Sequence, residues 1–220
     1  MIKVKKKILI LTEKKDWFYF YAKKLHIKLK YLGHQVRISD NHLKEQKKYD
    51  IVFMLSYYRI VNKKFLSLSN HNVVIHESDL PKGKGWAPLF WQVIEGKRKI
   101  IFTVFNANEG IDSGNFYFKE NFHLKGHELY SEIRKMQAKL RIKCCMKLIK
   151  NLNKLKLKKQ RGLSSFYTRR TKKDSEINIK KSIVSQFNLF RSVDNVNFPA
   201  FFNYKGHKYI LKIYKKKNKL

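Results

Sequence analysis

Cysteine, proline and glycine are scarce in this chain of 220 residues, which holds only two, three and nine of them. The two cysteines, Cys144 and Cys145, are neighbours, and adjacent residues rarely reach disulfide geometry, so a disulfide-rich secreted scaffold is excluded. Hydrophobic residues make up 43% and aromatics 14%, which suits a packed core and excludes a wholly disordered chain. No spacing typical of metal ligands is present, and no metal is expected.

Long apolar runs are missing as well. Residues 100–105 form one of the longest, far short of the roughly 20 residues that a membrane-spanning helix needs. The basic start is followed by a short apolar run at residues 8–11, which indicates a strand rather than a signal peptide. We therefore expect a cytoplasmic protein with no membrane partner.

Acidic residues are also few, since 16 Asp and Glu face 50 Lys and Arg, for a formal net charge of +34. Such a charge is typical of proteins with a polyanionic partner, such as RNA. Lysine far outnumbers arginine, however, asparagine and isoleucine are abundant, and the lysines are spread along the chain. We favour AT-rich coding as the origin of the charge, and a nucleic-acid partner stays open as the alternative.

Short strands that are apolar on both faces alternate with a helical pattern in the first half of the chain. Strands are predicted at residues 8–11, 36–39, 50–55 and 72–76, and an amphipathic helix at residues 17–32, which Gly33 ends. This alternation predicts an α/β fold, with a Rossmann-like, mostly parallel sheet and helices on both faces.

The second half predicts a catalytic domain that ends in a long helix, followed by a small appendage. Further elements are a helix at 88–95, strands at 100–105 and 115–119, and a helix at 128–152 whose apolar stripe we assign to the core. We divide the chain into a catalytic domain (1–152), a polar connector (153–180) and a small α+β accessory unit (181–220). That unit has a helix near 181–190 and a hairpin at 201–214.

Polar residues follow three of the predicted strands. The first strand leads into Thr12 and Glu13, the third into the segment 56–59, and the fourth ends at His76. Ligands of open α/β sheets bind at the carboxyl ends of the strands, so the site is expected where these three strands end.

The segment after the fourth strand carries a specific motif. Residues 76–81 read His-Glu-Ser-Asp-Leu-Pro, residues 85–88 read Gly-Trp-Ala-Pro, and 36 residues after His76 lies Asp112, in Gly-Ile-Asp-Ser-Gly. This pattern resembles the N10-formyltetrahydrofolate-dependent formyltransferases. Short bacterial sugar N-formyltransferases resemble the chain over nearly its whole length, through residues 76–88, 91–96, 126–129, 165–170, 173–176, 186–191, 194–195 and 198–202.

The resemblance implies a catalytic set and a co-substrate, N10-formyltetrahydrofolate. His76 would hydrogen-bond the formyl oxygen, and Asp112 would orient the ring and accept the amine proton. The family has an asparagine two residues before the histidine, where this chain has Val74. Asn72 shares the strand face of His76, about 6–7 Å further along than the family position, and we assign it the role of the missing asparagine.

Two segments are the candidate binding residues. As the family's pterin wall follows the third strand, folate contacts are expected from Ser56, Tyr57, Tyr58, Arg59 and Ile60. For the acceptor substrate we expect contacts from a glycine-containing loop and from two adjacent arginines that suit a diphosphate: Lys82, Lys84, Trp86, Arg169 and Arg170.

The resemblance implies formyl transfer to the amine of a nucleotide-linked amino sugar, in bacterial surface-glycan synthesis, with a homodimer as the expected assembly. Two alternatives stay open. The first is a methionyl-tRNA formyltransferase, which the charge favours but which in the family carries a full C-terminal barrel. The second is a basic nucleic-acid-binding module without catalysis, which would leave His76 and Asp112 unexplained.

Overall fold

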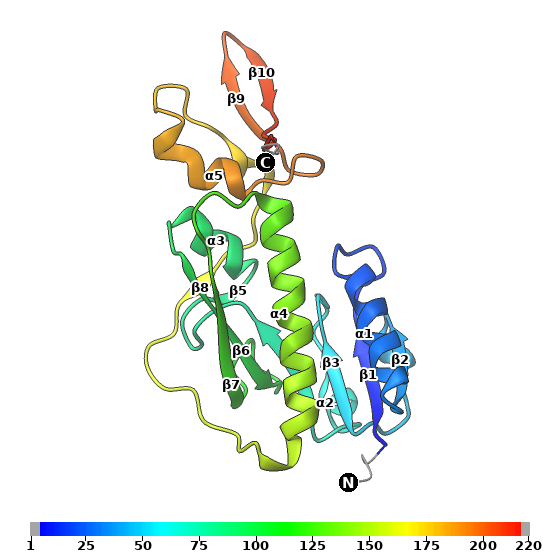
Figure 1. Cartoon of the computed structure of the whole chain (residues 1–220). Helices are drawn as coiled ribbons and strands as arrows, with labels where there is room; N and C mark the ends of the chain where they lie inside the picture. The colour runs from blue at the N-terminus through cyan, green and yellow to red at the C-terminus, as the bar shows by residue number, and fades with distance from the viewer. Residues whose placement is uncertain (1–4, 217–220) are drawn as a thin grey trace.

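The computed structural model describes residues 5–216 and is built around one six-stranded sheet in the order β2-β1-β3-β4-β6-β7 (Figure 1). The first four strands in this order pair in parallel, whereas β4–β6 and β6–β7 are antiparallel. The bounds are β1 (Lys7–Leu11), β2 (Gln35–Ser39), β3 (Ile51–Met54), β4 (Asn72–His76), β6 (Lys99–Asn106) and β7 (Phe116–His123). The predicted α/β class with a mostly parallel sheet is confirmed.

Side chains from both faces of the central strands are buried, which explains their continuous apolar runs. Ile8 and Ile10 of β1 join the main core cluster, to which α1 (Tyr19–Tyr31), α3 (Pro88–Ile94) and α4 (Tyr130–Asn151) contribute. Leu9 and Leu11, which alternate with them, pack in a smaller cluster with Phe65 of α2 (Lys63–Leu66). Helices therefore contribute to the packing on both faces, although one of them is only a single turn.

The long helix α4 packs along the sheet, and its predicted apolar stripe lies in the core (Figure 1). Ile133, Cys144 and Leu148 are fully buried on this side of the helix. Burial in apolar surroundings raises the pKa of the Cys144 thiol to about 12, so this cysteine stays a neutral core side chain at physiological pH.

The chain after α4 forms several short elements. Three of them are 3₁₀ turns: η2 (Leu152–Lys154), η3 (Lys172–Ser175) and η4 (Val184–Gln186). Another 3₁₀ turn, η1 (His42–Lys44), lies earlier in the chain, between β2 and β3. A two-stranded pairing joins β5 (Lys84–Gly85) of the predicted catalytic domain to β8 (Phe166–Tyr167) of the predicted connector.

The C-terminal hairpin is confirmed as β9 (Ala200–Tyr204) and β10 (His207–Leu211), which extend away from the sheet (Figure 1). The predicted helix at 181–190 is wrong in its first half, because α5 spans only Phe187–Ser192. The Ser182 hydroxyl accepts a hydrogen bond from the Ser185 N–H, so the side chain competes with helical bonding. A small apolar cluster of Ile177, Phe190, Val193 and Ala200 packs residues from both sides of position 181 against one another. The predicted boundary at residue 181 therefore divides a packed cluster.

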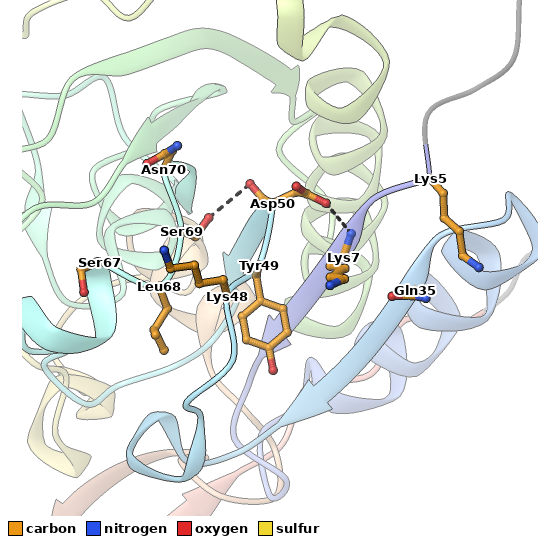
Figure 2. Close-up of a pocket in the computed structure, with 10 residues that line it drawn as sticks. All are labelled: Lys5, Lys7, Gln35, Lys48, Tyr49, Asp50, Ser67, Leu68, Ser69 and Asn70. Atoms are coloured by element: carbon orange, nitrogen blue, oxygen red, sulfur yellow. Dashed lines mark hydrogen bonds between the residues drawn. The ribbon is translucent and has the colours of Figure 1, made fainter.

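A surface pocket of about 490 Å³ lies at the amino ends of the parallel strands, between residues that precede or begin β1, β2, β3 and β4 (Figure 2). Asp50, which lines it, accepts a hydrogen bond from the Lys7 N–H at 2.6 Å. This pocket is at the opposite edge of the sheet from His76 and holds none of the predicted site residues. Within residues 5–216, no helix combines the length and the apolar character that crossing a membrane would need.

Candidate active site

His76 is the last residue of β4 and is 7% exposed. Its Nε2 lies 2.8 Å from the Gly83 carbonyl oxygen. A carbonyl can only accept, so this contact assigns the hydrogen to Nε2. The second ring nitrogen, Nδ1, is therefore the one that faces the remaining polar groups of the site.

Asp112 is the group that Nδ1 faces. Its Oδ2 lies 3.7 Å from His76 Nδ1, within ion-pair range but too far for a good hydrogen bond. Asp112 has a φ of 45°, in the left-handed region that few non-glycine residues adopt, and such strain is characteristic of functional sites. The structure thus brings together His76 and Asp112, the two residues that the family resemblance implies as a pair.

The backbone of Gly85 completes this constellation. Its N–H donates to Asp112 Oδ2 at 2.9 Å, so the aspartate has a fixed donor beside the histidine. Gly85 has a φ of 90°, and a Cβ there would lie 2.5 Å from the Tyr167 carbonyl oxygen. Only glycine fits between these two segments, which explains the glycine of the Gly-x-x-Pro motif.

His76 Nδ1 and the Gly85 N–H both lie next to Asp112 Oδ2, at 3.7 and 2.9 Å. A protonated Nδ1 is a donor for a developing oxyanion, and a carboxylate is an acceptor for a proton from an attacking amine. The arrangement can therefore support acyl-type transfer to an amine. Sequence reasoning did not find the roles of the Gly83 carbonyl and the Gly85 N–H, since they are backbone groups whose only signal was the glycine motif.

Asn72 does not belong to this set, contrary to the assignment made from the strand pattern. It begins β4, whereas His76 ends it, and its side-chain Nδ2 donates to the Leu66 and Ser69 carbonyls at 2.8 Å each. Both donors of the amide are used to hold the loop before β4. We therefore remove Asn72 from the catalytic residues and assign it a structural role.

The segment after β3 lies at the same edge as His76, and most of its polar groups have partners. Tyr57 hydroxyl lies 2.6 Å from His42 Nδ1, Tyr58 hydroxyl donates to Asp16 at 2.6 Å, and Arg59 pairs with Glu13 at 3.3 Å. Ile60 is 81% exposed. Ser56 has a φ of 50°. The polar groups of 56–59 are thus tied to this end of the sheet, while their use in folate binding stays a prediction.

Four of the five predicted substrate residues lie on or next to the loop 82–87, whose backbone bonds to His76 and Asp112. Trp86 stacks on Tyr58 with ring centroids 5.7 Å apart, and the Arg169 guanidinium lies 5.0 Å from the Trp86 ring centroid. Lys82 is exposed, whereas Lys84 is mostly buried, with its ammonium 5.8 Å from the Phe166 ring centroid. The candidate folate and substrate segments therefore meet at the Tyr58–Trp86 contact.

Arg170 is the exception among the predicted substrate residues. Its guanidinium donates to the Ser192 and Asp174 carbonyls at 3.2 Å each. Burial is the main cause that lowers the pKa of this side chain, which is half-enclosed between the connector and α5. We therefore correct the assignment: Arg170 fastens the connector to the accessory unit, and Arg169 alone is left of the two predicted diphosphate ligands.

A buried ion pair connects two of the segments that border the site. Arg141 of α4 donates from Nε to Glu77 Oε1 at 2.6 Å and from Nη1 to Ser56 Oγ at 2.8 Å. Burial alone would raise the pKa of the Glu77 carboxyl, but the charge and hydrogen bonds of Arg141 outweigh it and the pKa is lowered. Arg141 thereby links the residue after His76 to the residue that begins the candidate folate segment.

A family model described as formyl transferase matches residues 9–149, which is more than half of the chain. The chain therefore belongs to the formyltransferase family.

Curated relatives and solved structures agree with this class. A methionyl-tRNA formyltransferase of Rickettsia massiliae is 30% identical over 135 residues, which are 60% of this chain and 45% of the relative. The chain thus spans about half the length of the curated relatives it matches. A methionyl-tRNA formyltransferase from Clostridium thermocellum has a TM-score of 0.78 at 21% identity, over 97% of this chain and 95% of that one.

Two other solved structures share the fold. A sugar N-formyltransferase from a Shewanella species has a TM-score of 0.72 at 13% identity, over 97% of this chain and 99% of that chain. HypX from Aquifex aeolicus in complex with tetrahydrofolic acid has a TM-score of 0.79 at 15% identity, over 96% of this chain and 38% of that chain. At these identities the likeness defines the fold and leaves the acceptor open.

Proposed function

We propose that this protein transfers a formyl group from N10-formyltetrahydrofolate to the amine of a nucleotide-linked amino sugar. The observation that carries the proposal is the His76–Asp112 pair at the carboxyl edge of the sheet, with the Gly85 N–H on the same carboxylate. The bound tetrahydrofolate of the HypX structure supports folate as the formyl carrier.

The proposed reaction assigns one task to each group. The acceptor amine attacks the formyl carbon, a new C–N bond forms, and a tetrahedral oxyanion develops. His76 in its protonated form donates from Nδ1 to that oxygen, while the Gly83 carbonyl keeps Nε2–H in place. Asp112 accepts the amine proton; as the oxyanion returns to a carbonyl, the bond from carbon to N10 breaks, and Asp112 passes that proton to the N10 nitrogen that leaves.

A candidate folate wall is the segment 56–60, which follows β3 at the same edge as His76. Tyr58→Ala is expected to raise the Kd of 5-formyltetrahydrofolate, a stable analogue of the donor, about 3- to 10-fold, because an aromatic contact contributes about 0.5–1.5 kcal/mol. Tyr31→Ala is the matched control, since Tyr31 is 90% exposed on α1. Calorimetry decides: equal Kd values for the two variants would contradict a folate contact at Tyr58.

Methionyl-tRNA is the second candidate acceptor, and two observations favour it. The net charge is +34, and the curated relatives carry that name. The small accessory unit does not separate the two acceptors, because the Clostridium thermocellum enzyme structure is matched over 95% of its length.

The response to salt separates the two acceptors. A sugar nucleotide offers about two phosphates, for which Arg169, Lys82 and Lys84 suffice, so its KM should change only a few-fold between 50 and 200 mM salt. A tRNA contacted at six or more phosphates should lose roughly 10³-fold in affinity over that range. We expect formylation of at least one member of a panel of nucleotide-linked amino sugars, with the shallow response. Formylation of charged initiator tRNA with the steep response would refute the sugar acceptor.

A further inference from the structure

The connector between α4 and the accessory unit passes over the loops that carry the site. After η2 it runs back beside β7 and reaches β5 through β8 (Figure 1). We define residues 158–168 of this connector as the strap. Although most of its side chains are exposed, its backbone is bonded to two different loops of the catalytic region.

The first loop held by the strap is the one that carries Asp112. Lys158 and Phe116 exchange two backbone hydrogen bonds, of 2.9 and 2.8 Å. Two residues further along, Gln160 donates from Nε2 to the Asp112 carbonyl at 2.9 Å and to the Gly114 carbonyl at 2.8 Å. A single side-chain amide thus fixes the backbone on both sides of Ser113, immediately beside the strained φ of Asp112.

The second loop is the one that bonds His76 and Asp112 through its backbone. The Gly83 N–H donates to Ser165 Oγ at 2.9 Å, the Lys84 N–H to the Ser165 carbonyl at 2.9 Å, and the Trp86 N–H to the Tyr167 carbonyl at 3.0 Å. Between these anchor points lie the Gly83 carbonyl, which holds His76, and the Gly85 N–H, which holds Asp112. The same strap therefore holds the immediate backbone partners of both members of the pair.

We propose that the strap sets the relative position of His76 and Asp112, with Gln160 as the positioning residue for Asp112. The proposal rests on the proposed function of this pair. Its physical basis is that a misplacement of about 1 Å at a reacting group can lower the rate roughly 100-fold. Asp112 sits in an unfavourable backbone conformation, which persists only when its surroundings fix it.

The chemistry of Gln160 makes the proposal sharply testable. Both of its bonds use the side-chain nitrogen, while Oε1 is buried without a hydrogen-bond partner within residues 5–216. Gln160→Glu keeps the size of the side chain but turns two donors toward carbonyls into acceptors, so both bonds become repulsive contacts. Gln160→Met removes the donors without adding charge. Leu163→Ala is the control, because Leu163 lies on the same strap and is 88% exposed.

The experiment combines hydrogen exchange of the whole 220-residue chain with steady-state formyl transfer. In Gln160→Glu and Gln160→Met we expect faster exchange in residues 82–87 and 110–116, and unchanged exchange in β1 and α4. We expect kcat to fall at least about 10-fold, with the KM for the formyl donor within about 3-fold of wild type. Leu163→Ala should match the wild type in both measurements.

Two results would overturn the proposal. One is unchanged exchange in both loops of the Gln160 variants. The other is faster exchange with wild-type kcat, since the pair would then not depend on the strap. If the wild type formylates no nucleotide-linked amino sugar, the proposed acceptor is wrong, whereas the exchange comparison still decides whether the strap holds the two loops.

Discussion

His76→Ala and Asp112→Asn are each expected to lower turnover at least about 100-fold and to leave the fold intact. In the proposed reaction His76 supplies the donor for the developing oxyanion, and loss of such a donor typically costs about 10²–10³-fold in kcat. Asp112→Asn keeps the shape of the side chain and an acceptor for the Gly85 N–H, but it removes the proposed base for the amine proton. The measurement is kcat for formyl transfer, with circular dichroism to verify folding.

The control for this pair is His71→Ala. His71 lies just before β4, bonded at 2.9 Å to the Tyr117 hydroxyl, at the far end of the strand from His76. It should keep near-wild-type turnover. We also expect the double variant of His76 and Asp112 to be little slower than either single variant, because groups that act as a unit are not additive. Near-normal turnover in either single variant would exclude that residue from the mechanism.

The sequence predicted most of the sheet because its strands are short runs of apolar residues that alternate with recognisable helical periods. Residues 72–76 were predicted as a strand and form β4 with these bounds, and the predicted stripe of α4 lies in the core. Both signals depend on side-chain periodicity within one element, which a single sequence displays directly.

Contacts between distant segments could not be predicted in the same way. The strand pattern placed Asn72 on the correct face for a catalytic role, but it could not show that the Leu66 and Ser69 carbonyls take both of its donors. The residues of the strap were predicted as part of a polar connector, because their contacts leave no pattern in the sequence. The pairing of β8 with β5 covers only two residues, and the other bonds of the strap are mostly to backbone groups. Polarity alone does not distinguish a solvated linker from a segment that packs on a site.

The ion pair of Glu77 and Arg141 was also missed, because 64 residues separate its members and nothing in the local pattern links them. Its position explains why these charges are buried. Arg141 lies against the rings of Trp17 and Phe18 and bonds to the ends of β3 and β4, so one side chain joins three segments at the carboxyl edge. This network is accordingly the second place where a single substitution should have a large effect.

Arg141→Met is expected to destabilise the protein by about 3–5 kcal/mol, because it leaves the Glu77 carboxylate buried without its partner. For a chain of this length that corresponds to a fall in Tm of roughly 6–20 °C. Lys139→Met, on the exposed side of the same helix, is the matched control and should change the free energy of unfolding by less than about 0.5 kcal/mol. Replacing both members, as Glu77→Leu with Arg141→Met, should recover much of the loss, since no charge is then left unpaired.

The pH dependence of the stability deficit in Arg141→Met tests whether the unpaired Glu77 carboxylate causes it. In the wild type the pKa of Glu77 is lowered, so its contribution to stability is present above its unfolded value of about 4.5 and is lost as the pH falls through the folded value. Without Arg141, burial raises that pKa instead, and the cost of the unpaired charge grows as the pH rises above 4.5. The stability deficit of Arg141→Met should therefore be largest near pH 7 and clearly smaller near pH 5, measured by urea unfolding at both values. A deficit independent of pH would instead indicate lost packing against Trp17 and Phe18, and would contradict the role of the buried ion pair.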